Sequence, residues 1–381
     1  MIYFDNAATT LMKPPSVAEA VVRALESFGG PARGVHEASI ASSLAVYEAR
    51  ATIARLLGAQ SAGRVAFGCN ATDALNAAIE GLLPPGSHAI TTAASHNSVL
   101  RPLYRKVDRD GASLSIAPIA PDGSLDIKTY EKLFRPETVL VVATHASNVT
   151  GNVYDVRRMA RIAHDHGALF VLDAAQTAGA IPIHLQEDGF DAVAFTGHKS
   201  LFGPQGTGGI ALSSALEIPS YRVGGSGTHS YDRVHPSFMP ERLEAGTLNA
   251  HGLAGLAAGA AYLEEAGIEA VGARVRSLAR RFEEAVSRID GVCVYGGSPD
   301  AARCGIVALN VGRADSALVA DRLNADFGIC TRAGAHCAPL MHEALGTSDR
   351  GVVRFSFSHF NTEEEIDEGV GALEEIAREL A

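Results

Sequence analysis

The sequence of 381 residues contains no tryptophan, and charged residues make up only 20% of it. The absence of tryptophan argues against an aromatic platform on which nucleic-acid bases would stack. Lys and Arg number 32 against 43 Asp and Glu, and this net charge of −11 argues against binding to nucleic acid or to an anionic membrane. The apolar segment 253–263 is interrupted by Gly255 and Gly259, so we expect no membrane-spanning helix.

Cysteine is also scarce. Five cysteines, an odd number in a long chain, do not form the pattern of a disulfide framework. No two of them form a CxxC pair, so we expect no metal site. The first five residues lack the basic region and apolar stretch of a signal peptide. These absences predict a cytoplasmic protein in a reducing compartment.

The length and the 47% hydrophobic content predict two domains with substantial cores. Short apolar runs at 139–143, 168–172 and 192–195 do not alternate with polar residues, which is typical of buried strands in a parallel sheet. A helical pattern at 156–166 lies between the first two runs. The spacing predicts βαβ units and an α/β fold, in which ligands bind beyond the carboxyl ends of the strands.

The second part of the sequence is predicted to form a smaller domain. A long helical pattern over 252–288 leads into it, and its last helix is predicted to begin at a capping box over Thr362–Glu365. The first dozen residues are too polar for a core strand, so we expect them to lie across the interface between the domains. We therefore expect a large domain over 13–251 and a smaller α+β domain formed by 1–12 and 252–381.

A lysine follows one of the predicted buried strands, in the sequence Thr196-Gly197-His198-Lys199. At the carboxyl end of a strand, partial desolvation favours a neutral, nucleophilic amine. The preceding predicted strand ends at Asp173. A lysine and an aspartate so spaced are the pair that pyridoxal phosphate (PLP) chemistry needs, since the lysine binds the cofactor and the carboxylate keeps the pyridine nitrogen protonated. Taken alone, Lys199 would be interpreted as a surface residue that caps a loop.

A series of motifs in one order extends over nearly the whole chain, from 3–10 to 354–356. On these motifs the sequence resembles the group II cysteine desulfurases of the class V aminotransferase superfamily, which are PLP enzymes of fold type I. The resemblance implies a large domain with a mainly parallel, seven-stranded sheet between helices. The internal motifs are Arg33-Gly34-Val35-His36, Asn70-Ala71-Thr72-Asp73, Ser95-His96-Asn97, His145-Ala146-Ser147-Asn148, Asp173-Ala174-Ala175-Gln176, Thr196-Gly197-His198-Lys199, Glu244-Ala245-Gly246-Thr247 and Arg332-Ala333-Gly334-Ala335-His336-Cys337-Ala338.

The resemblance implies a role for each matching residue at the cofactor ring. Lys199 would hold the cofactor covalently and later move a proton. Asp173 would pair with the pyridine nitrogen, Gln176 would bind the ring hydroxyl, and His96 would stack on the ring and take part in catalysis. The other residues implied to bind the cofactor are Asn148, Ala71, Thr72, Thr196, His198 and Thr247.

The cofactor phosphate would lie where residues 70–73 open a helical pattern, because N–H groups at a helix N-terminus bind anions. Asn70 or Thr72 could also simply cap that helix. By resemblance, Thr72, Thr196 and His198 contact the phosphate. Many members of the group carry a threonine where this chain has Ala71, so we expect one hydroxyl contact fewer. Thr247 would reach the phosphate of a neighbouring subunit, which implies a homodimer with the active site at the interface.

A substrate carboxylate would be bound by arginine. Arg354 places a charge inside the apolar strand-like run 352–357, and an unpaired buried charge is costly. The run alone is equally consistent with an anionic ligand and with a buried ion pair to a glutamate. The resemblance implies that Arg354 binds the substrate carboxylate together with Asn148. The other residues implied in substrate binding are Arg332, Ala8 and His36.

Cys337 decides the type of reaction. It lies in a Gly- and Ala-rich loop after His336 and near Arg332, surroundings that favour a thiolate. In group II enzymes this cysteine takes the substrate sulfur as a persulfide. The alternative is a small buried thiol beside a structural histidine. The remaining cysteines lie in or beside apolar stretches, and we expect inert core residues at Cys69, Cys293, Cys304 and Cys330.

The resemblance thus implies a cysteine desulfurase that converts L-cysteine to L-alanine and passes sulfur to an acceptor protein, as in iron–sulfur cluster assembly. Four alternatives stay open: a selenocysteine lyase acting on L-selenocysteine, an enzyme acting on cysteine sulfinate, a class V aminotransferase of other specificity, and a binding protein that has lost the chemistry. The Gly- and Ser-rich segment 224–230 is consistent with a mobile loop over the partner's site or with a plain surface turn.

Overall fold

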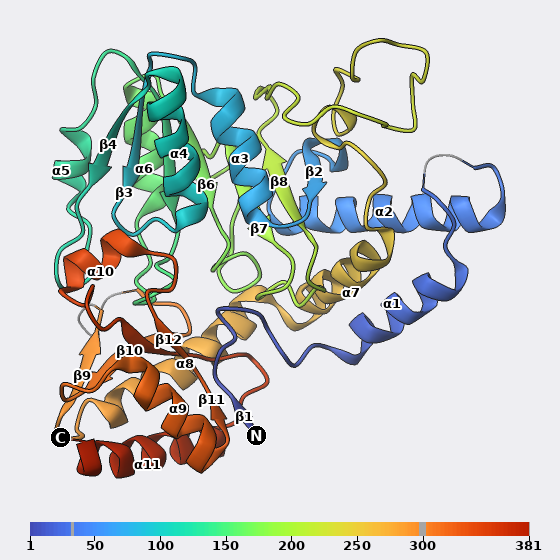
Figure 1. The fold of residues 1–381 in the computed structure, drawn as a ribbon. Helices are drawn as coiled ribbons and strands as arrows, with labels where there is room; N and C mark the ends of the chain where they lie inside the picture. The colour runs from blue at the N-terminus through green and yellow to red at the C-terminus, as the bar shows by residue number, and fades with distance from the viewer. Residues whose placement is uncertain (32–33, 297–301, 381) are drawn as a thin grey trace.

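A computed structural model of the chain describes residues 1–31, 34–296 and 302–380. Its larger sheet has seven strands, and the fold is α/β, as the sequence predicts (Figure 1). All neighbouring pairs from β7 through β4 are parallel, whereas β8 is antiparallel to both of its neighbours. In their order across the sheet the strands are β2 (Val65–Gly68), β8 (Gly208–Leu212), β7 (Ala192–Thr196), β6 (Leu169–Asp173), β5 (Thr138–Thr144), β3 (His88–Thr92) and β4 (Ser113–Ala117).

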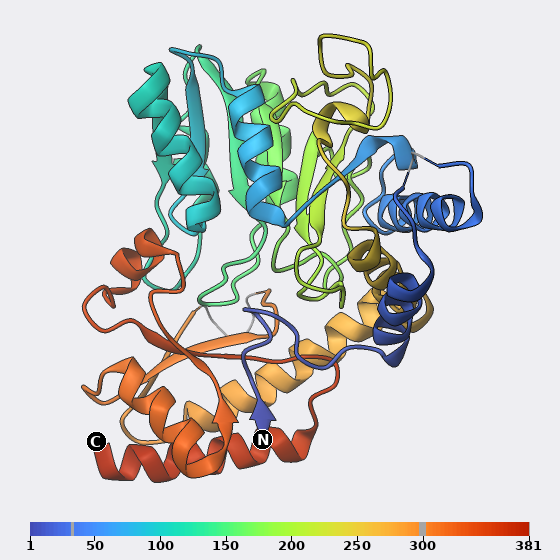
Figure 2. The ribbon, with the colours of Figure 1, turned by 45° about the vertical axis from the view of Figure 1, so that its right-hand side comes forward.

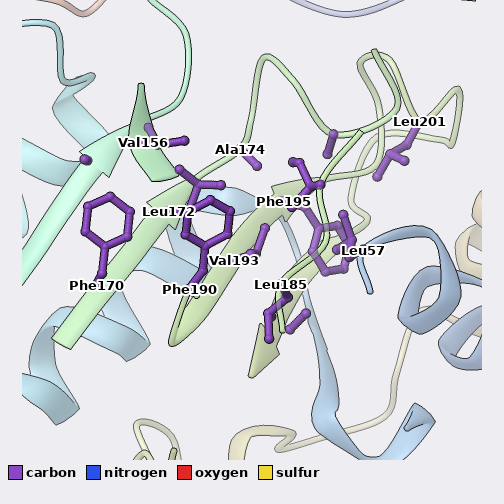
Figure 3. Packing of buried hydrophobic residues seen from close by; sticks show 14 of the residues in the cluster. Leu57, Val156, Phe170, Leu172, Ala174, Leu185, Phe190, Val193, Phe195 and Leu201 are labelled. Carbon is purple, nitrogen blue, oxygen red and sulfur yellow. The ribbon is translucent and has the colours of Figure 1, made fainter. Parts of the chain in front are cut away.

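Helices cover both faces of this sheet, which explains why its strands are uninterrupted apolar runs. Leu140 and Val142 of β5 face the helices α3 (Ala71–Leu82) and α4 (Asn97–Asp110). Their neighbours Val141 and Ala143 face a second apolar cluster. That cluster, part of which Figure 3 shows around β6 and β7, contains residues of α2 (Glu37–Leu56), α6 (Val156–Asp165) and α7 (Ala250–Ala266). Three short helical segments complete this part: η1 (Ala62–Arg64), α5 (Ile127–Glu131) and η2 (Glu241–Leu243).

A smaller sheet lies below the larger one in the views of Figures 1 and 2. Its antiparallel strands, in order, are β12 (Arg332–Gly334), β13 (Val352–Ser356), β10 (Ile306–Val311) and β9 (Val292–Tyr295). Its core is built with residues of the helices α8 (Ile268–Val286), α9 (Ser316–Phe327) and α11 (Glu363–Leu380). The short helix α10 (Pro339–Leu345) follows the Cys337 loop. The domain boundaries stated above stay a prediction.

The first residues of the chain are in part a core element. β1 (Ile2–Tyr3) pairs in parallel with β11 (Ile329–Cys330), and Phe4 is fully buried against Phe282 and Phe357. The expectation of no core strand in this segment is therefore wrong for residues 2–4. Two apolar residues next to a tyrosine are too short a run to predict a strand, and the partner strand lies more than three hundred residues away in sequence.

The helical pattern over 252–288 is divided. α7 ends and α8 begins at Gly267, whose positive φ of 79° suits glycine and lets the chain turn between the two helices. α7 packs against α1 (Pro15–Ser27) and α2, whereas α8 packs against α11 and the smaller sheet. The predicted capping box is confirmed by reciprocal bonds between Thr362 and Glu365 of 3.1 and 3.2 Å. Across the described residues, no helix has the length and apolarity needed to span a bilayer.

Candidate active site

A cavity of about 280 Å³ lies between the two sheets, beyond the carboxyl ends of β5, β6 and β7. It brings together every predicted site residue except His36 and Thr247. The predicted residues that line it are Ala8, Ala71, Thr72, His96, Asn148, Asp173, Gln176, Thr196, His198, Lys199, Arg332, Cys337 and Arg354. The site therefore lies where the strand pattern places ligands in α/β sheets.

Lys199 extends from the turn that follows β7 into this cavity. Burial, together with the positive charge of Arg354, lowers the pKa of Lys199 to about 8, while Asp173 acts in the opposite direction. A sizeable fraction of the amine is then neutral near physiological pH, and a neutral amine is the form that attacks a carbonyl carbon.

Asp173 is the last residue of β6, and its buried carboxylate accepts a hydrogen bond of 3.0 Å from the N–H of Ala175. Burial raises its pKa, so the ionised form gains from a cationic partner. Gln176, three residues on, donates from Nε2 to the carbonyl of Ala7 at 3.2 Å. Both side chains are thus held by backbone groups at the floor of the cavity.

His96 caps α4 and lines the cavity beside Lys199. Its Nδ1 accepts from the N–H of Ser98 at 3.0 Å, so Nε2 carries the proton of the neutral ring. Burial, aided by the charge of Lys199, lowers the pKa of His96 to about 4. The imidazole is therefore neutral, which suits stacking on an aromatic ring. Ser98 was not predicted; its place two residues after His96, at the start of a helix, was the available signal.

The N-terminus of α3 opens onto the cavity. Asn70 caps the helix by accepting from the N–H of Asp73 at 3.0 Å, and Ala71 and Thr72 form its first turn. The capping interpretation of Asn70 is therefore confirmed, and the end of the helix faces the cavity; binding of a phosphate there stays a prediction. The hydroxyl of Thr72 lies 2.7 Å from that of Ser98, and the buried hydroxyl of Thr196 has no partner among the described residues. These groups suit an anion.

Arg354 of β13 is 1% exposed and forms an ion pair of 2.9 Å between Nη2 and Asp5. Nη1 donates to the backbone carbonyl of Asn148 at 3.0 Å, and the buried Nε has no partner in the described parts of the chain. The buried ion pair considered from the sequence is thus present, but its acid is Asp5, not a glutamate. Arg332 lies directly opposite Arg354 in the β12–β13 ladder, so two positive charges face one end of the cavity.

Cys337 lies in a loop with unusual backbone angles. His336 and Cys337 both have positive φ, 48° and 56°, a region that costs non-glycine residues energy. Side-chain Nδ2 of Asn148 donates to the carbonyl of His336 at 2.7 Å, and the N–H of Asn97 donates to that of Cys337 at 2.8 Å. His336 in turn contacts the carbonyl of Val352 through Nε2. The thiol is exposed and lines the cavity, so the alternative of a small buried thiol is wrong.

Two predicted site residues lie elsewhere. His36 is exposed, its side chain caps α2, and it does not line the cavity that contains Lys199. Thr247 lies in the loop after Glu244, in a separate cavity beside the buried Arg50–Glu244 ion pair. Arg33, which begins the His36 motif, lies outside the described residues.

The prediction of inert core cysteines is wrong for two of the four. Cys304 is buried, and burial raises its pKa to about 11, while Cys330 is partly buried. Cys69 is exposed in the turn between β2 and α3, and Cys293 is exposed on the edge strand β9. An apolar neighbourhood in sequence does not bury a turn residue or the open side of an edge strand.

Comparison with known proteins places the chain in a family. The model of the family described as aminotransferase class-V matches residues 2–368. A probable cysteine desulfurase from Halobacterium salinarum is 34% identical over an alignment of 390 residues that covers 100% of this chain and 92% of the relative. A cysteine desulfurase from Salmonella dublin is 30% identical, with 100% and 94% covered.

Solved structures agree. The apo structure of a cysteine desulfurase from Thermococcus onnurineus NA1 superposes with a TM-score of 0.93 at 33% identity and covers 100% of this chain and 95% of that one. The S-sulfonic acid form of the cysteine desulfurase CsdA from Escherichia coli gives a TM-score of 0.90 at 29% identity, with the same coverage. The chain therefore belongs to the class V aminotransferase family, whose members use PLP, and has the fold type I architecture of the solved cysteine desulfurases.

Proposed function

We propose that the protein is a PLP-dependent cysteine desulfurase that converts L-cysteine to L-alanine and takes the sulfur onto Cys337. The observation that carries the proposal is the exposed Cys337 thiol in the same cavity as Lys199 and Arg354. A transaminase has no use for such a thiol, whereas sulfur transfer requires one. The full-length similarity to cysteine desulfurases supports the same conclusion.

The residues present fit PLP. Polar atoms of Asn148, Thr196 and Arg354 are buried at the cavity with no partner in the described residues, and a bound ligand would satisfy them. Alanine side chains, among them Ala71 and Ala146, leave room for a flat ring. The residues that would hold the cofactor are Lys199, Asp173, Gln176, His96, Asn148, Ala71, Thr72, Thr196 and His198. When bound, PLP serves as an electron sink for the amino acid joined to it.

The chain's own residues supply the remaining steps. Arg354 would bind the substrate carboxylate, with Arg332 adding positive charge from the neighbouring strand. Lys199 would take the proton from the α-carbon, because its amine is neutral for part of the time at neutral pH. Asp173, His96 and Gln176 would orient the ring.

The sulfur step balances without any added oxidant or reductant. The thiolate of Cys337 attacks the substrate sulfur, and a bond forms between the two sulfur atoms. The bond between that sulfur and the substrate β-carbon breaks, its electron pair stays with the carbon, and a proton is added there. The α-carbon regains the proton that Lys199 took. The products are L-alanine and a persulfide on Cys337, whose outer sulfur would pass to a thiol of an acceptor protein.

The test is to assay the purified protein side by side with L-cysteine, L-selenocysteine and cysteine sulfinate and to count the alanine formed. The proposal expects alanine from L-cysteine, and it expects that Cys337→Ala stops this reaction while the cofactor stays bound. Alanine only from L-selenocysteine would make the protein a selenocysteine lyase. Full desulfurase activity in Cys337→Ala would rule out sulfur transfer to this residue.

We also propose that the protein acts as a homodimer. Large apolar side chains are exposed along α1 and α2, including Leu25, Leu44 and Tyr47, each more than half exposed. Thr247 borders a cavity that also includes Tyr47, so its predicted contact with the neighbouring subunit's phosphate fits a partner on this face. The exposed segment 224–230 would lie near the same interface, since Gly225 accepts the N–H of Gly246.

A further inference from the structure

Asp5 forms an ion pair with Arg354, and the proposed chemistry leaves this aspartate without a role. Its Oδ1 lies 2.9 Å from Nη2 of Arg354, whose side chain is 2% exposed, while that of Asp5 is 20% exposed. Burial lowers the pKa of Arg354, and the negative charge of Asp5 acts in the opposite direction. No group among the described residues bonds to Nε of Arg354, so this atom can donate to another anion.

The segment that carries Asp5 is fixed at both ends of the cavity. At the smaller sheet, Asp5 forms a parallel bridge with Ser356, and the N–H of Ala7 donates to the hydroxyl of Ser356 at 2.9 Å. At the larger sheet, the hydroxyl of Thr10 donates to the carbonyl of Lys199 at 2.9 Å. The segment 5–10 therefore holds the aspartate at a set position relative to both Arg354 and Lys199.

Two negative groups would then share one guanidinium when an amino acid binds. Asp5 holds Nη2, and the substrate carboxylate would approach the same cation. Like charges on one site repel, so each weakens the binding of the other. Asp5 also offsets part of the cost of burying the guanidinium of Arg354 near the positive charges of Arg332 and Lys199.

We propose that Asp5 is a positioning residue that orients Arg354 and, through its charge, limits how tightly the site binds the carboxylate of substrate and product. This inference rests on the proposed function, because it takes an amino-acid carboxylate as the ligand of Arg354. Its consequence is faster release of L-alanine, which presents the same carboxylate as L-cysteine.

The experiment measures binding of L-alanine, which lacks the sulfur to react, to the cofactor-loaded protein through the change in cofactor absorbance. Asp5→Asn keeps an oxygen acceptor for Nη2 but removes the charge. It is expected to lower the Kd for L-alanine roughly tenfold, as befits the loss of one like charge from a shared cation. KM for L-cysteine falls with it, while kcat does not rise. The control variant Glu19→Gln also removes one negative charge, but from an exposed position on α1, and it is expected to leave the Kd unchanged.

Further variants separate a charge effect from a structural one. Asp5→Glu keeps the charge and is expected to bind L-alanine as the wild type does. In an Arg354→Gln background, Asp5→Asn is expected to change the Kd by less than about twofold, since the effect acts through the arginine. Asp5→Ser is likewise expected to lower the Kd for L-alanine, and this variant takes the place of Asp5→Asn if Asp5→Asn does not fold. Thermal unfolding of the cofactor-free protein gives a second readout: added acetate stabilises Asp5→Asn more than the wild type.

An unchanged or weaker affinity for L-alanine in the folded neutral variants would overturn the proposal. The result is separable from the proposed function, because L-alanine binding needs no sulfur chemistry. A wild-type protein that makes no alanine from L-cysteine would refute the desulfurase assignment and leave the comparison of L-alanine affinities readable.

Discussion

Replacing Asn148 by alanine should loosen the loop that presents Cys337. The side chain of Asn148 donates a hydrogen bond of 2.7 Å from Nδ2 to the carbonyl of His336, and both groups are buried. The loop needs this bond because His336 and Cys337 both have positive φ. Two left-handed non-glycine residues cost about 1–2 kcal/mol each, a strain that only surrounding contacts maintain.

The size of the effect follows from this contact. The substitution leaves the buried carbonyl of His336 without its partner, which costs about 1–3 kcal/mol. A weakening of about 2 kcal/mol corresponds to a roughly 30-fold larger population of the open loop. The backbone of Asn148, which accepts from Arg354, is unchanged by the substitution.

Hydrogen exchange measured by mass spectrometry on the segment 335–345 is the assay. Exchange should accelerate roughly 30-fold in Asn148→Ala, in proportion to the open population, and stay unchanged in Asn324→Ala, which alters an exposed asparagine on α9. The rate of sulfur transfer from L-cysteine should fall in the first variant alone. Unchanged exchange together with an unchanged rate would refute the view that Asn148 holds the nucleophile loop.

Three further predictions concern charge and assembly. The rate at which cofactor-free protein takes up PLP should rise with pH and level off above about 8, where Lys199 becomes neutral; a flat profile between pH 6 and 9 would contradict the lowered pKa. The side chains of Arg50 and Glu244 are only 8% and 7% exposed, so Glu244→Gln would leave the charge of Arg50 buried without an ionic partner. This substitution should reduce the free energy of unfolding by about 3 kcal/mol in urea titrations, and a loss below about 1 kcal/mol would contradict the expectation. Leu44→Glu on α2 should shift the protein towards monomer in sedimentation experiments and lower activity, whereas an unchanged dimer would place the interface elsewhere.

The sequence predicts the part of this molecule that follows from local pattern. The strands β5, β6 and β7 are apolar on both faces, so their runs are unbroken, and the polar residues that follow them meet at one edge of the sheet. The sequence pattern alone therefore predicts that Lys199 and Asp173 lie close together. The capping box at Thr362 has the same local character.

Contacts between distant segments could not be predicted in the same way. Asp5 and Arg354 are separated by 349 residues, and only the fold shows that this aspartate pairs with that arginine. β1 is too short to be recognised without its partner strand. The break at Gly267 depends on a single positive φ, and a lone glycine in a helical pattern does not predict it. Exposure of Cys69 depends on what covers the turn after β2, and exposure of Cys293 depends on which side of the edge strand β9 is covered.

The measurement that tests the central claim most directly is the mass of the intact chain after incubation with L-cysteine in the absence of a sulfur acceptor. The account predicts the gain of a sulfur atom, located by peptide mapping on Cys337, together with alanine in matching amount at the first turnover. Cys337→Ala should gain no sulfur. Alanine formed from L-cysteine with no sulfur on Cys337, or with sulfur on another cysteine such as the exposed Cys69, would contradict the account.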